Sequence, residues 1–319
     1  MTIQNNAQLS EVLWYKIGGK AKYLLTVENR NDIDEVLAFI AKEKPKRIFI
    51  CGQGSNLIFS DDYFDGAIIQ IVSSNPDVSI AENTVTAFAG TVLGDVIDIA
   101  FDNNLTGLEW AGGLPGTVGA GVRGNVGAYG GDIKDSLISA EVIDFSEGKF
   151  VLKKLSNEQL QFVYRGSVIK TTKNMIVVSA TFGLKKSTPE EIAVAREVCE
   201  HNKQNRRDKH PLEYPNCGSV FKNLRDKEQI ERVLHIYPDL RENVEKKWYG
   251  KIAVASLIEK LGLKGLQIGN AQISEKHALF IINKGNAKAK DVLAIIARVN
   301  KEFKNRFGFE PEVEVEIVE

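Results

Sequence analysis

Cysteine, histidine and methionine are scarce in this chain of 319 residues. Its three cysteines, Cys51, Cys199 and Cys217, have no paired spacing, so we expect reduced thiols and no disulfide scaffold. Its four histidines are scattered without ligand spacing, which argues against a metal site.

The chain also lacks an excess of charge of either sign and has no long apolar run. Lys and Arg total 41 against 42 Asp and Glu, so the net charge of −1 gives no reason to expect a nucleic acid or a membrane as partner. No apolar run approaches the roughly 20 residues that span a bilayer. The amino terminus lacks the basic start and apolar core of a signal peptide. We therefore expect a cytoplasmic protein, and a monomer because no heptad or exposed apolar stripe demands a partner.

The length favours two or three domains, and the element signals favour a mixture of α/β and α+β units. Apolar spacing predicts a helix at 33–40, a buried strand at 47–50 and a helix at 91–104. Strand signals dominate 139–184, including LQFVYR at 160–165.

A polar helix is predicted at 188–207, with Thr188 as its N-cap and Pro189 at its first position. Helix and strand signals alternate after it, which is typical of a separate α+β domain. We predict lobes at 1–76 and 77–205 and a third domain at 206–319.

A first glycine loop, CGQGSN, follows the strand at 47–50 and contains Gly52, Gly54, Ser55 and Asn56. Backbone N–H groups in such a loop form a nest for phosphate oxygens, and serine and asparagine add donors. The loop is neither a G-x-G-x-x-G fingerprint nor a Walker loop with its lysine. Taken alone, such a loop is more often a plain tight turn.

A second stretch, residues 107–131, is unusually rich in glycine. Glycine is costly in a folded chain, and a loop that needs positive φ explains only two or three of these residues. A long cofactor with a pyrophosphate, lying across both glycine stretches, would explain the whole set. Flavin is favoured because the nicotinamide fingerprint is missing.

Further short patches carry reactive side chains: YRGS at 164–167, NCGSVFKN at 216–223 and EPEVEV at 310–315. Each has an ordinary explanation when taken alone. Arg165 fits a surface ion pair, Ser219 a turn residue, and Glu312 a solvated run of charges.

The order of the motifs carries a resemblance. They run YKIGGKA (15–21), GQGSNL, LPGTVGA with NVGAYGG, YRGS, GSVFKN, LKGLQIGNAQISEKHALFIIN and FGFEPEV. In this order the chain resembles the UDP-N-acetylenolpyruvoylglucosamine reductase (MurB) family, from about residue 13 to residue 315. The chain between Arg165 and Ser219 is too short for the tyrosine-bearing loop of one branch, so it resembles the shorter branch.

The resemblance implies a two-lobed FAD-binding portion of the vanillyl-alcohol-oxidase type and a C-terminal α+β substrate-binding domain. It implies that NADPH reduces FAD, which then reduces the enolpyruvyl group of UDP-N-acetylglucosamine enolpyruvate to give UDP-N-acetylmuramate. That product would serve peptidoglycan synthesis, and through it cell-wall biogenesis, cell shape and cell division. The sequence itself places no arginine that would distinguish NADPH from NADH.

The resemblance also implies roles for single residues. Hydride addition at the terminal CH2 leaves negative charge on C2 and the carboxylate, which calls for a cation, a hydrogen-bonding carboxyl group and a proton donor. By similarity these are Arg165, Glu312 and Ser219, and burial would favour the protonated form of Glu312 that helps most. The expected substrate contacts are Tyr164, Lys209, Asn223 and His277. The expected FAD contacts are Gly52, Gly54, Ser55, Asn56, Leu57, Pro115, Gly116, Thr117, Gly119, Asn125 and Gly127.

The chain departs from the family pattern in places: Arg123 and Gly124 replace larger or uncharged residues, and 241–251 is long and basic. One alternative is a different FAD oxidoreductase on the same scaffold, although 107–131 offers no His or Cys to tether flavin. Another is a flavin- or nucleotide-binding module that has lost its chemistry. For His277, a satisfied histidine at the start of a buried strand is as good an interpretation as a substrate contact.

The acidic terminus, PEVEVEIVE, predicts a strand. Side chains alternate along a strand, so Glu312, Glu314 and Glu316 should share one face. Val313, Val315 and Ile317 should then share the other.

Overall fold

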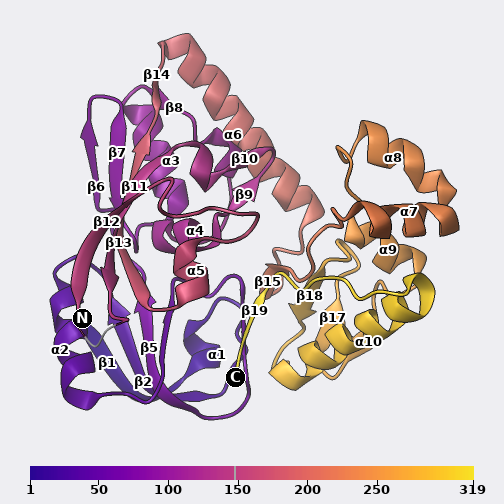
Figure 1. Ribbon diagram of the computed structural model, residues 1–319, viewed down its shortest axis with the longest axis horizontal. Helices are drawn as coiled ribbons and strands as arrows, with labels where there is room; N and C mark the ends of the chain where they lie inside the picture. The colour runs from indigo at the N-terminus through magenta and orange to yellow at the C-terminus, as the bar shows by residue number, and fades with distance from the viewer. Residues whose placement is uncertain (147–148) are drawn as a thin grey trace. The chain divides into compact units, whose positions relative to one another are not determined.

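A computed structural model describes residues 1–146 and 149–319 of the chain (Figure 1). The chain divides into two compact units. Unit 1 consists of residues 1–7, 21–53 and 64–208, and unit 2 of residues 8–20, 54–63 and 209–319. Among the described residues, no helix combines the length and the apolar character needed to cross a membrane.

Unit 1 contains a four-stranded sheet in the order β1-β2-β5-β3. The strands are β1 (Thr2–Gln8), β2 (Lys20–Val27), β3 (Ile48–Cys51) and β5 (Phe64–Ile71). β2 and β3 both pair parallel with β5. α2 (Asp32–Glu43) contributes Ile33, Val36 and Ile40 to the same core as the apolar residues of this sheet. The helix and the strand predicted in this region are confirmed.

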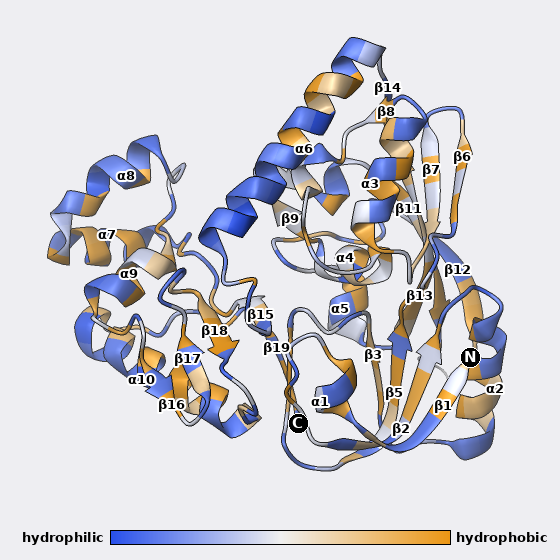
Figure 2. Cartoon of the chain, turned by 180° about the vertical axis from the view of Figure 1, so that it is seen from behind, coloured by the Kyte–Doolittle hydropathy of each residue, from blue (hydrophilic) through white to orange (hydrophobic). Residues whose placement is uncertain are grey.

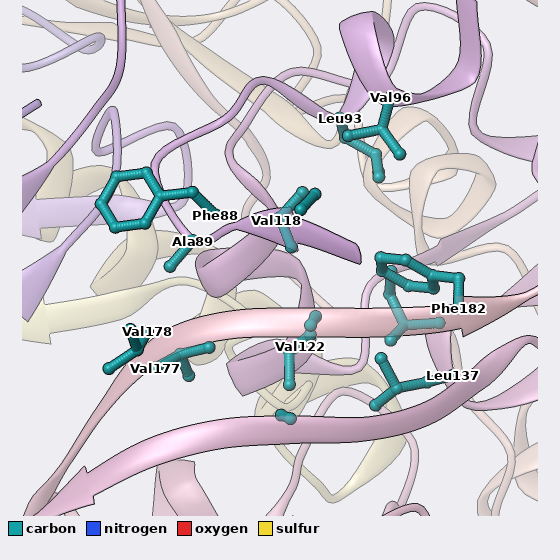
Figure 3. Close-up of a cluster of buried hydrophobic side chains, with 14 of the residues drawn as sticks. Phe88, Ala89, Leu93, Val96, Val118, Val122, Leu137, Val177, Val178 and Phe182 are labelled. Atoms are coloured by element: carbon teal, nitrogen blue, oxygen red, sulfur yellow. The ribbon is translucent and has the colours of Figure 1, made fainter. Parts of the chain in front are cut away.

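A second sheet of unit 1 has the order β12-β11-β13-β7-β6, and every neighbouring pair is antiparallel. The strands are β6 (Val78–Ala81), β7 (Thr84–Phe88), β11 (Leu137–Asp144), β12 (Val151–Ser156) and β13 (Met175–Gly183). α3 (Leu93–Asp102) and α4 (Val118–Gly124) pack against it. Figure 3 shows Val118 and Val122 of α4 lying against the strand that carries Val177 and Phe182. Because both valines are fully buried, α4 is fixed to this sheet.

Short elements complete unit 1. They are β8 (Leu105–Thr106), η1 (Glu109–Ala111), β9 (Gly127–Ala128), β10 (Gly131–Asp132), η2 (Ile133–Asp135), α5 (Val168–Thr172) and β14 (Lys185–Lys186). α6 (Pro189–Lys209) is the polar helix that the sequence predicts, and its ribbon is mostly hydrophilic in Figure 2. The predicted cap is confirmed: Thr188 Oγ1 accepts from the N–H of Glu191 at 3.3 Å, and Glu191 Oε2 accepts from the N–H of Thr188 at 2.9 Å.

The predicted strand at 160–165 is wrong. Leu160 is fully buried but Val163 is 63% exposed, and the backbone turns between them. Val163 and Gly166 exchange backbone hydrogen bonds of 3.0 and 3.1 Å, which close a tight turn around Tyr164 and Arg165. The β-like spacing of apolar residues therefore does not form a strand here.

Unit 2 is built on a sheet in the order β15-β18-β17-β16. The strands are β15 (Asn216–Ser219), β16 (Gln267–Ile268), β17 (Ala271–Ile273) and β18 (Phe280–Asn283). The helices are α7 (Lys227–Ile236), η3 (Pro238–Leu240), α8 (Arg241–Lys246), α9 (Val254–Lys260) and α10 (Ala289–Phe307). α10 packs against β16 and β17 and ends at Gly308, whose φ of 79° suits glycine (Figure 1). The predicted alternation of helix and strand is confirmed.

Two segments from early in the sequence belong to unit 2. One contains α1 (Leu9–Val12) and Tyr15, whose hydroxyl donates to the carbonyl of Ile281 at 2.8 Å. The other contains β4 (Leu57–Phe59), which pairs parallel with β19 (Glu316–Val318). The division at 1–76, 77–205 and 206–319 stays a prediction, and it assigns these two segments differently from the compact units.

Candidate functional site

The loop after β3 combines tight packing with unused backbone donors. Gly54 has a φ of 78°, and a Cβ on it would lie 2.7 Å from Leu13 Cδ2. In the part of the chain that the structure describes, the N–H groups of Gln53, Gly54, Ser55 and Asn56 donate no hydrogen bond. A row of free N–H groups next to a glycine with positive φ is suited to phosphate oxygens. The loop therefore fits the pyrophosphate of a dinucleotide such as FAD.

The two glycine stretches come into contact within unit 1. A Cβ on Gly52 would lie 2.5 Å from Thr117 Oγ1 and 3.4 Å from the Cβ of Ala120. Thr117 is 2% exposed and precedes α4. The next N–H groups are already used: Val118 donates to Thr91 O and Gly119 to Ala89 O, each at 2.9 Å. The start of α4 thus shapes the site, and the N–H groups of Val118 and Gly119 are not available as donors to a ligand.

Five of the ten glycines in 107–131 are explained by packing inside the protein, so a cofactor is not needed to explain the whole set. A Cβ would come within 3.2 Å of protein atoms at Gly112 (Cys199), Gly113 (Lys203, Arg206), Gly119 (Ala89), Gly127 (Asp132) and Gly131 (Trp110). Gly119 and Gly127 therefore have structural reasons of their own. Contacts to FAD at these positions, and at Pro115 and Gly116, stay predictions.

Arg165 is held at the tip of its turn by several contacts. Its φ of 60° lies in the left-handed region, where glycine is usual, so the backbone is strained at this position. Its Nη2 donates to the carbonyl of Gly127 at 2.8 Å, and its Nη1 lies 3.9 Å from Asp132 Oδ1. The guanidinium lies 5.0 Å from the centre of the Tyr164 ring. The cation is thus fixed in position before any ligand arrives.

Asn125 supports this turn and is completely buried. Its Nδ2 donates to the carbonyl of Val163 at 3.0 Å, and its Oδ1 accepts from the N–H of Lys134 at 3.1 Å. Both ends of the amide are therefore used inside unit 1. These two hydrogen bonds do not test the predicted contact between Asn125 and FAD, which stays a prediction.

In unit 2, Ser219 ends β15 at the edge of the sheet, opposite Phe280. Gly218 before it has a φ of 78°, and Asn216 Oδ1 accepts from its N–H at 3.0 Å. A Cβ on Gly218 would lie 3.9 Å from the carbonyl oxygen of Ser55. The strand that carries Ser219 thus lies beside the part of the glycine loop that belongs to unit 2.

His277 packs in an aromatic group with His210 and Phe280, at ring separations of 5.5 and 5.0 Å. Its Nδ1 accepts from the N–H of Leu279 at 3.2 Å. Burial lowers the pKa of His277, so the imidazole is neutral at pH 7 and its proton is on Nε2. His210 directly follows Lys209, which brings that lysine into the same neighbourhood. The satisfied histidine expected as one interpretation is observed, and a substrate contact stays a prediction.

Asn223 lies at the start of α9. Its Oδ1 accepts from the N–H of Val254 at 3.2 Å, and the neighbouring Leu224 exchanges backbone hydrogen bonds with Ile252. The asparagine is therefore fixed four residues after Ser219 in the chain.

The segment around Glu312 lies beside the residues that follow Ser219. The N–H of Lys222 donates to Glu312 O at 2.9 Å, and the N–H of Glu314 donates to Val220 O at 2.7 Å. The Lys222 ammonium forms an ion pair with the Glu312 carboxylate. Lys222 is 19% exposed and Glu312 is 70% exposed, so the burial that would favour the protonated form of Glu312 is not observed. Sequence reasoning missed Lys222 because its partner is distant in the chain.

The predicted alternation along the acidic terminus is only partly correct. Val315 is buried, but Ile317 is 38% exposed and Val318 is buried. Residues 313 and 316–318 pair with different strands, Val313 with Phe221 and β19 with β4. The change of partner shifts the buried face by one residue, so the segment is not a single strand.

Comparison with known proteins gives a consistent result for both units. Residues 210–318 match the model of the UDP-N-acetylenolpyruvoylglucosamine reductase C-terminal domain, and residues 21–152 match an FAD binding domain.

Similar full-length proteins carry the same description. A UDP-N-acetylenolpyruvoylglucosamine reductase of Latilactobacillus sakei is 36% identical over 318 residues, covering 100% of this chain and 94% of the relative. One of Caldicellulosiruptor saccharolyticus is 38% identical over 308 residues, covering 96% and 89%. The crystal structure of the reductase (MurB) from Thermus caldophilus superimposes with a TM-score of 0.74 at 28% identity and covers all of both chains.

Proposed function

The chain belongs to the UDP-N-acetylenolpyruvoylglucosamine reductase family, and from this we propose which of its residues carry out the reduction. The protein is an FAD- and NADPH-dependent oxidoreductase with a fold of the vanillyl-alcohol-oxidase type in its FAD-binding portion. It reduces the enolpyruvyl group of UDP-N-acetylglucosamine enolpyruvate to UDP-N-acetylmuramate in peptidoglycan precursor synthesis. Bound FAD supplies the hydride, which it receives from NADPH.

The loop at Gly52–Leu57 and the start of α4 hold FAD. The N–H groups of Gln53 to Asn56, which donate no hydrogen bond within the described part of the chain, would receive the pyrophosphate oxygens, and Ser55 and Asn56 would add side-chain donors. Thr117 fixes the width of the site at Gly52. The remaining contacts are at Pro115, Gly116, Gly119, Asn125 and Gly127.

Arg165 stabilises the charge that forms on the substrate. Hydride addition at the terminal CH2 leaves negative charge on C2, which spreads into the carboxylate. A guanidinium already held by Gly127 O and the Tyr164 ring needs little reorganisation to meet that charge. Electrostatic preorganisation of this kind is the role that we assign to Arg165.

Ser219 delivers the proton that completes the reduction. One hydride at the CH2 and one proton at C2 together saturate the double bond, and the serine oxygen is left to regain its proton from solvent. A serine is a weak acid in water, but the enolate carbon is strongly basic and a closed site excludes competing solvent. The strand β15 and the turn at Gly218 fix the direction of this side chain.

Glu312 contributes the carboxyl group beside the developing enolate. It lies on the segment that pairs with Val220 and Lys222, immediately after Ser219. Tyr164, Lys209, Asn223 and His277 complete the substrate site. Lys209 suits the diphosphate or the carboxylate, and Asn223 suits the uridine or a phosphate oxygen.

The remaining assignments follow from this chemistry. A UDP-sugar and NADPH are small molecules of the cytoplasm, which is the location that we assign to the protein, as a monomer with no nucleic acid or membrane partner. Through peptidoglycan, the reaction serves cell-wall biogenesis, cell shape and cell division.

One observation carries the residue assignment: the segment with Glu312 is hydrogen-bonded to the residues that follow Ser219, as Glu314 N–H to Val220 O at 2.7 Å. The test is NADPH oxidation by the FAD-loaded protein with and without UDP-N-acetylglucosamine enolpyruvate, with the product identified by mass spectrometry. We expect turnover only with the sugar nucleotide, and one UDP-N-acetylmuramate formed per NADPH consumed. NADPH oxidation that is indifferent to the sugar nucleotide would instead favour another FAD oxidoreductase.

A further inference from the structure

Lys222 is tied to Glu312 through both backbone and side chain. Its N–H donates to Glu312 O at 2.9 Å, and its ammonium pairs with the carboxylate of the same residue. The bridge between Phe221 and Val313 fixes the two segments in register. The ion pair therefore joins two residues whose Cα positions the backbone has already set.

The two members of the pair differ in exposure. The Lys222 side chain is 19% exposed and is largely held by its surroundings, whereas the Glu312 side chain is 70% exposed. A glutamate has three rotatable side-chain bonds, and ordering a free one costs conformational entropy. A fixed ammonium restricts where that carboxylate can go.

Lys222 lies among residues that we assign to the substrate site, which suggests a role for the ion pair in that site. It lies three residues after Ser219 and directly before Asn223, and its partner is Glu312. Exposed ion pairs as such contribute little to stability. A role in orienting the carboxyl group therefore explains this pair better than a role in stabilising the fold.

We propose that Lys222 is a positioning residue, which holds the carboxyl group of Glu312 in the orientation that meets the developing enolate and whose ammonium offsets the negative charge that would otherwise repel the enolate. The inference rests on the proposed role of Glu312. It assigns to Lys222 an action through Glu312 and no binding of substrate. Carboxyl groups that stabilise a transition state must be placed within a fraction of an ångström, and misplacement by about 1 Å can cost ~10²-fold in rate.

The test is a double-mutant cycle on the reoxidation of reduced FAD by the enolpyruvyl substrate, followed by stopped-flow absorbance. The proteins are wild type, Lys222→Met, Glu312→Gln and the double variant. Methionine keeps the apolar stem of the lysine and removes its charge. We expect Lys222→Met to lower the limiting rate of reoxidation by ~10- to ~10²-fold, with the substrate concentration for half-maximal rate nearly unchanged, and to have no further effect in the Glu312→Gln background. Lys222→Arg should recover most of the rate.

Lys260 provides a matched control. It pairs with Asp239 at 2.7 Å in the same unit and is 29% exposed, so it resembles Lys222 in burial and pairing. Lys260→Met should leave both half-reactions at the wild-type rate.

The outcomes separate the inference from the function on which it rests. Two results would overturn the inference while Glu312→Gln still slows reoxidation. In the first, the effect of Lys222→Met adds in full to that of Glu312→Gln. In the second, Lys222→Met raises the substrate concentration needed for half-maximal rate, which would mean that Lys222 binds substrate directly. If Glu312→Gln has no effect on reoxidation, the proposed role of Glu312 is wrong, and the inference about Lys222 is overturned with it.

Discussion

The buried side-chain amide of Asn125 donates to the carbonyl of Val163 at 3.0 Å, and so ties the end of α4 to the turn that presents Arg165. Its Oδ1 at the same time accepts from the N–H of Lys134. Loss of this amide would leave the N–H of Lys134 without this acceptor, and the carbonyl of Val163 with only the hydrogen bond from the N–H of Gly166. The orientation of the arginine thus depends on a residue outside its own turn.

Asn125→Ala should destabilise the protein and slow the reaction of the substrate. Each of the two hydrogen bonds lost contributes roughly 0.5–1.5 kcal/mol to stability. We expect a lower denaturant midpoint and a lower reoxidation rate of reduced FAD. Asn103→Ala is the control, because Asn103 also donates to a backbone carbonyl, Ile99 O at 2.9 Å, but on the surface. Equal stability of the two variants would contradict the role of Asn125.

Gly52→Ala should impair FAD binding. The new Cβ would lie 2.5 Å from Thr117 Oγ1, so the loop or the buried Thr117 side chain must shift. Gly124→Ala is the control, because no atom lies within 4 Å of a Cβ there and alanine favours a helix by about 1 kcal/mol. The measurement is the amount of FAD released from each purified protein on denaturation, together with its affinity for added FAD. Full FAD content in Gly52→Ala would show that this contact does not shape the site.

Ser219→Ala should separate the two half-reactions. Reduction of bound FAD by NADPH needs no proton donor at the substrate carbon, so its rate should stay near wild type. Reoxidation by the enolpyruvyl substrate should slow by ~10²-fold or more, the lower range for loss of a positioned general acid. Stopped-flow absorbance follows both steps, and equal slowing of both would indicate a structural role at the FAD site.

The three glutamates of the terminus should respond differently to replacement by glutamine. Glu312→Gln should slow reoxidation by about 10²- to 10³-fold, as for loss of one preorganised electrostatic contact. Glu314→Gln and Glu316→Gln keep the backbone bonds to Val220 and Asn56 and should react at nearly the wild-type rate. Reoxidation rates of the three variants, measured side by side, decide the assignment. Three similar rates would remove Glu312 from the mechanism.

Asp144 should make stability depend on pH in the acid range. The hydrogen bond from Lys153 at 2.7 Å, followed by that from Ser146, lowers the pKa of Asp144 from 3.8 to about 2. Because the folded pKa is the lower one, the stabilisation is complete above about pH 4 and is lost as the pH falls towards 2. Asp144→Asn should lower the denaturant midpoint at pH 7 and converge with wild type near pH 2.

The converse control for Asp144 is a pair on the surface. Asp102 pairs with Arg196 at 2.6 Å but is 68% exposed, so Asp102→Asn should change the midpoint little at any pH. A difference between wild type and Asp144→Asn that persists at pH 2 would contradict the linkage to this carboxyl group.

Local signals in the sequence predicted most elements but not their exceptions. Apolar spacing located α2, capping residues located α6, and strand signals covered β11 and β13, because each of these signals is local to its element. The turn at Val163–Gly166 was predicted as a strand, since the left-handed backbone of Arg165 leaves no trace in apolar spacing. The end of the chain changes pairing partner at Val315, which no local pattern reveals.

The residues of the candidate site were predicted mainly from their resemblance to family motifs, and less from the physical properties of the residues themselves. Glycine abundance indicated a cofactor, yet the contacts of Gly112 and Gly131 with Cys199 and Trp110 show that side chains of the protein also require it. Lys222 was missed, because an ion pair between residues ninety positions apart has no signature within either segment.

The segments at 8–20 and 54–63 bear on how the protein folds. β4 pairs with β19, and the Tyr15 hydroxyl bonds to Ile281, so these early residues find their partners only after most of the chain has been made. Contacts of such high sequence separation slow folding and leave intermediates exposed to aggregation. On the ribosome, unit 2 would therefore be the last to form. A chain that stopped before residue 316 would leave β4 as an unpaired edge strand.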